Sequence, residues 1–331
     1  MIFLDGITWS VQRRGGIWTY FEALLDRLNA DGLTYELCHH EAGIGPAEGF
    51  RPKRVGERFR RVSVPPGIDV FLSSYYRRPV QEVPSVVTVH DFVYEAMLSG
   101  AKTRVHAWQK HAAIREADQI ICVSEATRAD LLKYIGQPKG RIHVIHNGVS
   151  EVFRPTRGAK DHGGYVIYVG HRHRYKNFAL ARDAMAHLPG MDLVCVGGEP
   201  WTDTEKAETE ALLTGRLITR QNVPTEQLNA LMNGAVALAY PSLYEGFGIP
   251  VIEAMRAGTP AVAVPCAAVQ EAGGAALLVA DTGTAEDFAA QIGRCLGPER
   301  AQIVERGLEH ARAFSWDRTH AQTAQILTGY L

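Results

Sequence analysis

The stretch PSLYEGFGIPVIEAMRAGTP, residues 241–260, reads as a strand end, a glycine-bracketed turn and a helix that ends before the strand AVAV. Gly246 and Gly248 lack a Cβ, so the backbone between them can approach a ligand closely. Pro250 suits the first helical turn, because its missing N–H has no partner there in any case. A turn that leads into a helix N-terminus offers unpaired N–H groups and partial positive charge, which favour a phosphate. Glu245 and Glu253 flank this turn, where a carboxylate can accept hydrogen bonds from sugar hydroxyls, so the segment predicts a nucleotide-sugar site; a solvated first helical turn is the alternative.

The rest of the chain alternates short apolar runs with helical patterns, as in MIFL before GIWTYFEALLDRL and QIICV before SEATRADLLKYI. Continuous apolar strands of this kind are typical of a parallel sheet covered by helices on both faces. The segment EVFRPTRGAKDHGG, residues 151–164, interrupts the rhythm with proline, glycine and charge and predicts a linker. The fold class is therefore α/β with two Rossmann-like domains, and ligands are expected at the C-terminal ends of the strands.

Composition narrows the function classes. The 331 residues are 46% hydrophobic and 21% charged with a net charge of −1, which is typical of a globular protein and excludes a globally basic nucleic-acid binder. The five scattered cysteines contain no C-x-x-C pair, and they predict buried free thiols in a reducing compartment. No signal peptide and no run of eighteen apolar residues occurs, so we expect a cytoplasmic protein.

The string at residues 241–260 resembles the donor-site signature of retaining GT-B glycosyltransferases of family four, also described as glycosyltransferase group 1. The resemblance covers most of the chain. It implies that Glu245 faces the transferred sugar and that Glu253 holds the ribose hydroxyls of the nucleotide. It also implies two domains that face each other across a cleft, with residues 1–155 on the acceptor side, residues 156–315 binding the nucleotide sugar, and a C-terminal helix, residues 316–331, crossing back to the first domain. Further donor-binding residues predicted from this string are Gly246, Phe247, Gly248 and Ile249.

A second basic element is YVGHRHRYKNF, residues 168–178, which follows a predicted strand. A diphosphate needs cationic partners, and Arg172 can offer a guanidinium fork while Lys176 offers a point charge. The stretch resembles the second donor element of the family, which implies catalytic roles for both residues; a basic solvated loop is the alternative. His171 and His173 depart from the family pattern and are expected at the cleft edge. No nearby carboxylate or cysteine is expected to complete a metal set with them, so no metal site is expected.

Two elements of the N-terminal half, at Gly15-Gly16 and at His90, resemble other parts of the family's site, and a third, at Asn147, is predicted from its turn alone. The turn at Gly15 and Gly16 precedes a helix and is expected beside the donor phosphates or the acceptor. His90 ends the apolar strand VVTV and is assigned to the catalytic sugar pocket, with a structural histidine as the alternative. Asn147 in VIHNGV is expected in a turn that approaches the donor. The acceptor side is expected to include Arg13 and Arg14, for which surface solvation is the alternative.

The string DVFLSSYYRRP, residues 69–79, resembles mannosyltransferases that build O-antigen chains and places Tyr75 and Tyr76 on the acceptor side. The basic run between residues 51 and 61 includes Arg58, Arg60 and Arg61 and suits an anionic membrane surface, because each basic residue contributes about 1 kcal/mol near such a surface. A solvated loop is the alternative reading of this run.

The sequence therefore predicts retaining transfer of a hexose from a nucleotide sugar to a glycan or lipid-linked acceptor in cell-surface polysaccharide synthesis. GDP-mannose is the expected donor, and UDP-sugars remain open. No D-x-D motif occurs, so neither a metal nor another cofactor is expected to bridge the diphosphate. The alternatives are a nucleotide-sugar epimerase of the same fold and a non-catalytic protein that binds nucleotide sugars. No nucleic-acid partner is expected.

Overall fold

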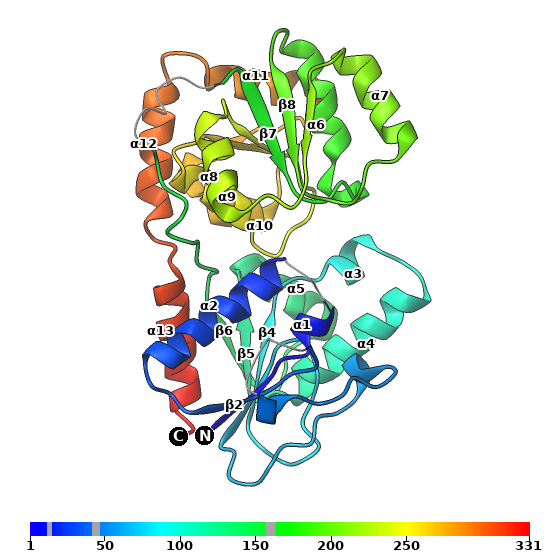
Figure 1. Ribbon diagram of the computed structural model, residues 1–331, viewed down its shortest axis with the longest axis vertical. Helices are drawn as coiled ribbons and strands as arrows, with labels where there is room; N and C mark the ends of the chain where they lie inside the picture. The colour runs from blue at the N-terminus through cyan, green and yellow to red at the C-terminus, as the bar shows by residue number, and fades with distance from the viewer. Residues whose placement is uncertain (12–14, 42–46, 157–162) are drawn as a thin grey trace. The chain divides into compact units, whose positions relative to one another are not determined.

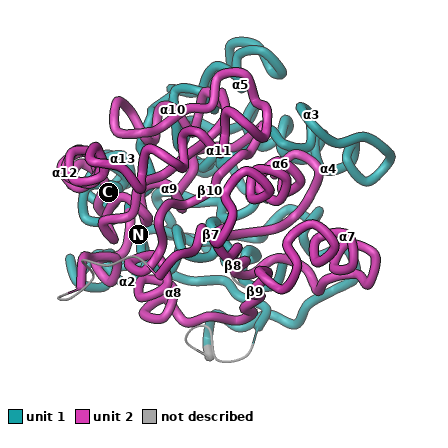
Figure 2. Tube along the Cα trace, turned by 90° about the horizontal axis from the view of Figure 1, so that it is seen from above, with its two compact units in different colours: residues 1–148, 316–331 teal, residues 149–315 magenta. Residues whose placement is uncertain are grey.

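The computed structural model describes residues 1–11, 15–41, 47–156 and 163–331. It divides into two compact units (Figure 2), of which unit 1 contains residues 1–148 and 316–331 and unit 2 contains residues 149–315. The boundary predicted between residues 155 and 156 lies later in the chain than this division. The difference has a structural reason, because Val149 already forms a parallel bridge with Ser315, so the chain enters and leaves unit 2 side by side.

Unit 1 is built around a parallel sheet. Among its described residues, six strands lie in the order β2-β1-β3-β4-β5-β6. The strands are β1 (Ile2–Asp5), β2 (Tyr35–Cys38), β3 (Val70–Ser73), β4 (Ser85–Val89), β5 (Gln119–Cys122) and β6 (Arg141–Val144). The helices are α1 (Thr8–Val11), α2 (Gly16–Ala30), α3 (Val93–Met97), α4 (Ala101–Glu116), α5 (Glu125–Ile135) and α13 (Trp316–Thr328).

The C-terminal helix α13 belongs to unit 1 and packs against α2 (Figure 1). Trp316 and Leu327 of α13 enter the same buried core as Tyr20 and Leu24 of α2. The ring centroids of Trp316 and Tyr20 are 6.0 Å apart in an edge-to-face arrangement. Burial of such large apolar side chains is the main stabilising term of a fold, so it fixes the last helix to the unit that contains the N-terminus.

Unit 2 is built around a second parallel sheet, in which six described strands lie in the order β12-β11-β10-β7-β8-β9. The strands are β7 (Tyr165–Val169), β8 (Asp192–Val196), β9 (Leu217–Arg220), β10 (Leu238–Tyr240), β11 (Ala261–Ala263) and β12 (Leu278–Val279). The helices are α6 (Phe178–Ala184), α7 (Asp203–Leu213), α8 (Thr225–Gly234), α9 (Ile249–Arg256), α10 (Ala267–Gly273), α11 (Ala285–Arg294) and α12 (Arg300–Ala311). Figure 1 shows helices on both faces of this sheet, with α6 packed on α11 and α8 on α9.

The strand order of unit 2 is that of a doubly wound Rossmann sheet. Counted from β7, the order is 3-2-1-4-5-6, so the direction of strand addition reverses between β7 and β10. These two strands are direct neighbours, with Ile167 paired to Leu238. Ligands of such sheets bind outside the carboxyl ends of the strands at this reversal. The loops that follow β7 and β10 are therefore the expected ligand-binding loops of unit 2.

No helix within the described ranges is both long enough and apolar enough to cross a membrane.

Candidate active site

The turn after β10 leads directly into helix α9, as the sequence predicts. Gly248 caps the helix with φ 110°, a backbone conformation that L side chains rarely adopt, so a glycine is required there. Pro250 lies in the first turn of α9, where its missing N–H leaves no hydrogen bond unmade. The next residues, Val251 and Ile252, are buried and fix the helix on the sheet. The helix N-terminus is thereby held at the carboxyl end of β10.

Lys176 and Glu245 join the two loops at the reversal of the sheet. The Lys176 ammonium donates a hydrogen bond to Glu245 Oε1 at 2.5 Å, and the two side chains are 16% and 12% exposed. The Tyr240 hydroxyl, at the end of β10, donates to the same oxygen at 2.6 Å. A charged pair that is mostly desolvated interacts more strongly than one on the surface. The structure therefore brings together two of the residues predicted to act on the donor, one from each loop.

Arg172 lies in the same loop as Lys176 but contacts the loop after β8 and the first turn of α7. Its Nε donates to Glu205 at 2.6 Å, and its Nη2 donates to the Glu199 carbonyl oxygen at 2.6 Å. The guanidinium stacks on the Trp201 ring with 4.0 Å from Cζ to the centroid. Nη1 is buried and has no hydrogen-bond partner among the described residues. Arg172 thus fixes one loop against the other, and its Nη1 group makes no hydrogen bond to the described residues.

Tyr168, at the end of β7, lies within electrostatic reach of both predicted catalytic groups. Its hydroxyl donates to the His171 carbonyl oxygen at 2.6 Å. Burial is the main reason that the pKa of this tyrosine lies above its usual range, and the charges of Glu245 and Arg172 act on it in opposite directions. The side chain stays neutral at physiological pH and supports the loop that carries Arg172.

Glu253 lies one turn into α9, half-buried, and no described residue donates a hydrogen bond to its carboxylate. Desolvation raises its pKa from 4.5 to about 7. Removal of water destabilises an unpaired carboxylate, which raises its free energy and favours the protonated form. The side chain is therefore a hydrogen-bond acceptor that the described residues leave unsaturated, which is the property expected of a group that contacts hydroxyls of a ligand.

One neighbour of His171 and His173 was not predicted from the sequence. Glu199, after β8, lies beside both His171 and His173, so the sequence-based statement that no carboxylate completes this group is wrong. The three residues come from two loops that only the pairing of β7 with β8 brings together. Tyr240, Glu205 and Trp201 were also not predicted, and no local sequence pattern signals them.

The other residues of the donor-binding string differ in exposure. Phe247 is buried, and its ring centroid lies 5.7 Å from that of Phe314 in the interior of unit 2. Ile249 is half-buried and Gly246 is buried. The side chain of Phe247 therefore has a packing role, and the predicted contact with the nucleotide sugar is left to its backbone.

Several predicted site residues lie in unit 1. Gly15 precedes α2 and Gly16 begins it. His90 is buried next to Tyr20, burial lowers its pKa to about 3, and its Nε2 has no hydrogen-bond partner in the described part of the chain. Asn147 is buried, and its Oδ1 likewise has none among the described residues. Their contribution to the donor site stays a prediction, and Arg13 and Arg14 lie outside the described residues.

The residues predicted for the acceptor or membrane side make contacts within unit 1. Arg58 stacks on Phe59 and on Tyr75, and the Tyr75 hydroxyl lies 3.2 Å from His106 Nε2. Tyr76 is buried, with φ 59°. Three arginines of this group have protein partners: Arg60 donates to the Val55 carbonyl oxygen, Arg61 pairs with Glu116, and Arg58 stacks as described. The basic run is therefore partly structural.

Comparison with known proteins identifies the class. Residues 149–309 match the family described as "Glycosyl transferases group 1", and residues 68–152 match "Glycosyltransferase Family 4". The O-antigen chain mannosyltransferase B of Escherichia coli is 29% identical over 265 residues, which cover 72% of this chain and 68% of that protein.

Solved structures give the same class of fold. Sucrose-phosphate synthase from Thermosynechococcus elongatus superimposes with a TM-score of 0.80 at 20% identity, covering 99% of this chain and 98% of that one. Anabaena HepE in complex with UDP and glucose gives 0.69 at 17% identity, covering 99% of each chain.

Two Rossmann-like units with these neighbours define a GT-B fold. The chain belongs to the group 1 glycosyltransferases, and it is an enzyme of that class. The opposition of the two units across a cleft stays a prediction.

Proposed function

We propose that this protein transfers a hexose from a nucleotide sugar to a saccharide acceptor, with retention of anomeric configuration and without a metal ion. The observation that carries the proposal is the hydrogen-bonded pair of Lys176 and Glu245 at the reversal of the unit 2 sheet. A cation and a carboxylate held there suit the two ends of a nucleotide sugar, because one attracts phosphate and the other accepts hydrogen bonds from sugar hydroxyls.

In the proposed donor complex, the diphosphate lies against the N-terminus of α9. The partial positive charge of this helix end and the Lys176 ammonium offset the charge of the leaving nucleotide diphosphate. The phosphate competes with Glu245 for the ammonium and frees that carboxylate to accept hydrogen bonds from the sugar. Arg172 strengthens the same region by fixing the loop that carries Lys176, and its unused Nη1 is a further donor.

Glu253 is proposed to accept hydrogen bonds from the ribose hydroxyls. Its half-buried carboxylate has a pKa raised to about 7 by desolvation and no hydrogen-bond donor among the described residues. Hydroxyl donors of a ligand would stabilise the charged form. A charge-assisted hydrogen bond of this kind contributes about 1.5–3 kcal/mol.

Retention follows in this proposal from a dissociative path on one face of the sugar. The bond from the anomeric carbon to the phosphate oxygen breaks with its electron pair passing to the diphosphate, and the acceptor hydroxyl then attacks the same face. The leaving phosphate takes the proton of that hydroxyl. Glu245 stabilises the developing positive charge of the sugar without forming a bond to it, because its carboxylate still accepts a hydrogen bond from the Tyr240 hydroxyl and accepts others from the sugar hydroxyls.

The proposed donor is GDP-mannose, supported by the similarity to the E. coli O-antigen mannosyltransferase. A UDP-sugar is the second candidate, favoured by the likeness of the fold to a protein solved with UDP and glucose. The proposed acceptor is a glycan or lipid-linked saccharide.

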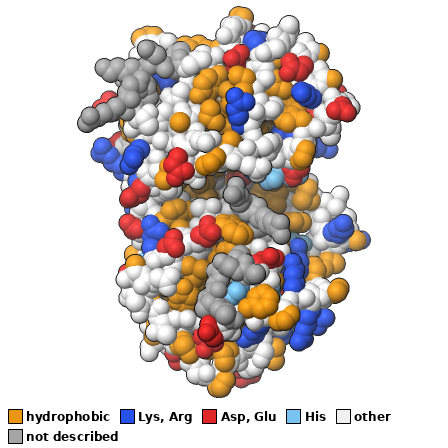
Figure 3. Space-filling view, viewed as in Figure 1, with side chains coloured by type: hydrophobic (Ala, Val, Ile, Leu, Met, Phe, Trp, Pro, Cys, Tyr) orange, Lys and Arg blue, Asp and Glu red, His pale blue; other side chains and the backbone are white. Residues whose placement is uncertain are grey.

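A cytoplasmic location with peripheral membrane contact is also part of the proposal. The five cysteines are free and buried, as in proteins of reducing compartments. Val55 and Phe59 are exposed within the basic run of unit 1, and Figure 3 shows basic and hydrophobic side chains close together over the region of α3 and α4. Exposed apolar groups beside cations suit an anionic membrane surface.

A nucleotide-sugar panel tests the proposal. Thermal unfolding is measured with GDP-mannose, UDP-glucose and the free nucleotides, all in the presence of EDTA, and is followed by an assay of nucleotide release with acceptor saccharides. Binding at one hundred times the dissociation constant adds about 2.7 kcal/mol, which is a clear rise in the midpoint. A rise with one donor and acceptor-dependent release support the proposal. Release without acceptor would favour an epimerase, and no rise with any donor would refute it.

A further inference from the structure

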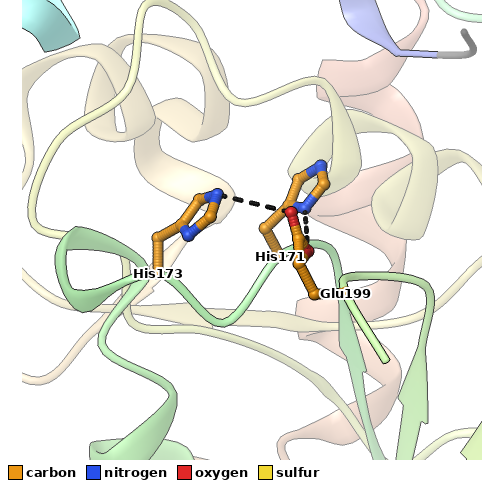
Figure 4. Close-up of side chains that lie close together, drawn as sticks. All are labelled: His171, His173 and Glu199. Atoms are coloured by element: carbon orange, nitrogen blue, oxygen red, sulfur yellow. Dashed lines mark hydrogen bonds and ion pairs between the residues drawn. The ribbon is translucent and has the colours of Figure 1, made fainter. Parts of the chain in front are cut away.

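His171, His173 and Glu199 form a compact group on the surface of unit 2 (Figure 4). His171 Nδ1 lies 3.0 Å from Glu199 Oε2, and His173 Nε2 lies 3.7 Å from Glu199 Oε1. The two imidazole rings are parallel within 7°, with centroids 5.2 Å apart. One nitrogen or oxygen atom from each of the three residues lies within 4.8 Å of the others.

Other contacts beneath the group hold the two loops together without these three side chains. Arg172, between the two histidines, donates from Nη2 to the carbonyl oxygen of Glu199 at 2.6 Å. Gly198 has φ +79°, and a Cβ there would lie 2.7 Å from the Gly170 carbonyl oxygen. The loops after β7 and β8 are therefore close because Gly198 has no side chain. The three side chains are presented by a preformed pair of loops, so little ordering is needed for them to bind a common ligand.

The donor set selects a class of ligand. Imidazole and carboxylate are the groups that bind Zn²⁺ and its neighbours in the first transition series, whereas Mg²⁺ and Ca²⁺ prefer all-oxygen sites. Tetrahedral Zn²⁺ with bonds of about 2.0–2.1 Å separates its ligand atoms by about 3.4 Å. The two histidine-to-carboxylate distances of 3.0 and 3.7 Å, which end on different oxygens of Glu199, lie close to that value, and one ligand atom from each of the three residues lies within 4.8 Å of the others. Three protein ligands leave the remaining positions to water.

We propose that His171, His173 and Glu199 bind a divalent transition-metal ion of the zinc class, which clamps the loop after β7 to the loop after β8. The side chains are between 52% and 55% exposed, so a metal ion can reach them from solvent. The clamp lies outside the pair of Lys176 and Glu245 and is not required for sugar transfer. Its effect is on the loop that carries Arg172, because the two metal-binding histidines flank this arginine in sequence.

Metal binding is measured by titrating the full chain with ZnCl₂ and, separately, with MgCl₂ in a calorimeter near neutral pH. We expect one Zn²⁺ per chain and no heat from Mg²⁺ at the same concentrations. Replacing a ligand should weaken Zn²⁺ binding at least tenfold, since even residues that only support a ligand cost tenfold to one hundredfold. The variants are His171→Ala, His173→Ala and Glu199→Gln, and the control is His187→Ala, which removes an exposed histidine elsewhere in the same unit.

Co²⁺ provides a second readout, because its visible absorption depends on the ligands and their geometry. A band that appears with the parent chain and with His187→Ala but not with His173→Ala supports the site. Undiminished Zn²⁺ binding by the variant with all three substitutions would overturn the proposal, as would the absence of binding by the parent chain. Far-UV circular dichroism confirms that the variants are folded. None of these measurements uses a nucleotide, so their outcome is independent of the proposed sugar transfer.

Discussion

Replacing Glu253 with glutamine should make the ligand-free protein more stable at alkaline pH. The pKa of this carboxyl is raised from 4.5 to about 7 in the folded state by desolvation, so folding favours its protonated form. Between these two values the folded state binds more protons than the unfolded state, and stability falls as the pH rises. Above about pH 7 the carboxyl is charged in both states, and the folded protein bears the full free-energy cost of desolvating the charge. At about 1.4 kcal/mol for each unit of the pKa shift, this cost is about 3 kcal/mol.

The assay is urea unfolding of the parent chain and Glu253→Gln at about pH 5.5 and about pH 8.5, where the linkage relation gives costs of about 1 and about 3 kcal/mol. The variant should therefore gain about 2 kcal/mol more at the higher pH. Glu286→Gln is the control, since Glu286 is an exposed glutamate in the first turn of α11 of the same unit. It should show no such difference between the two pH values.

Donor binding should change in the opposite direction. If Glu253 accepts hydrogen bonds from the ribose, Glu253→Gln weakens nucleotide binding by about 1.5–3 kcal/mol while it stabilises the free protein. A gain in stability with unchanged nucleotide affinity would show that the carboxyl is desolvated but does not bind the ribose. Equal stability of the parent chain and the variant at about pH 8.5 would refute the reasoning from desolvation.

The remaining predictions concern charge and pH. Lys176→Ala should lower kcat by about one hundredfold or more, whereas Lys206→Ala on the exposed face of α7 should leave it unchanged. Arg172→Ala should also lower turnover by about one hundredfold, and transfer at the parental rate would show that the phosphate role is wrong. Burial lowers the pKa of His90 from 6.5 to about 3. Below about pH 6.5 the unfolded state therefore binds more protons than the folded state, and the free energy of unfolding decreases as the pH is lowered. His90→Gln should reduce the loss of stability between about pH 8 and pH 5 by about 2 kcal/mol, measured by urea unfolding. Flotation with anionic liposomes should recover more protein than flotation with neutral ones, and Phe59→Ser should reduce the difference; equal recovery would exclude membrane contact through the basic run.

Much of the fold is predictable because its signals are local. Apolar runs of four or five residues followed by helical patterns locate β1, β4, β7 and β8 and the helices after them. The helix that follows QIICV is α5, which Ser124 caps by accepting a hydrogen bond from the Thr127 N–H. Three strands were not predicted, namely β2, β3 and β9. In β9, Leu217–Arg220, only the first two residues are apolar and burial is only partial, since it is an edge strand with one neighbour.

The site divides in the same way. The glycine turn, Pro250 and the two glutamates are encoded within twenty residues, because backbone conformation and helix initiation depend on neighbours in sequence. The pairing of Lys176 with Glu245 spans a sequence separation of 69 residues, and that of His171 with Glu199 spans 28. Both depend on which strands become neighbours in the sheet. The sequence by itself determined the α/β class, the loop chemistry and the glycosyltransferase resemblance. Only the tertiary structure decided that β7 lies between β10 and β8. This order places Glu245, after β10, on one side of the loop that follows β7 and Glu199, after β8, on the other.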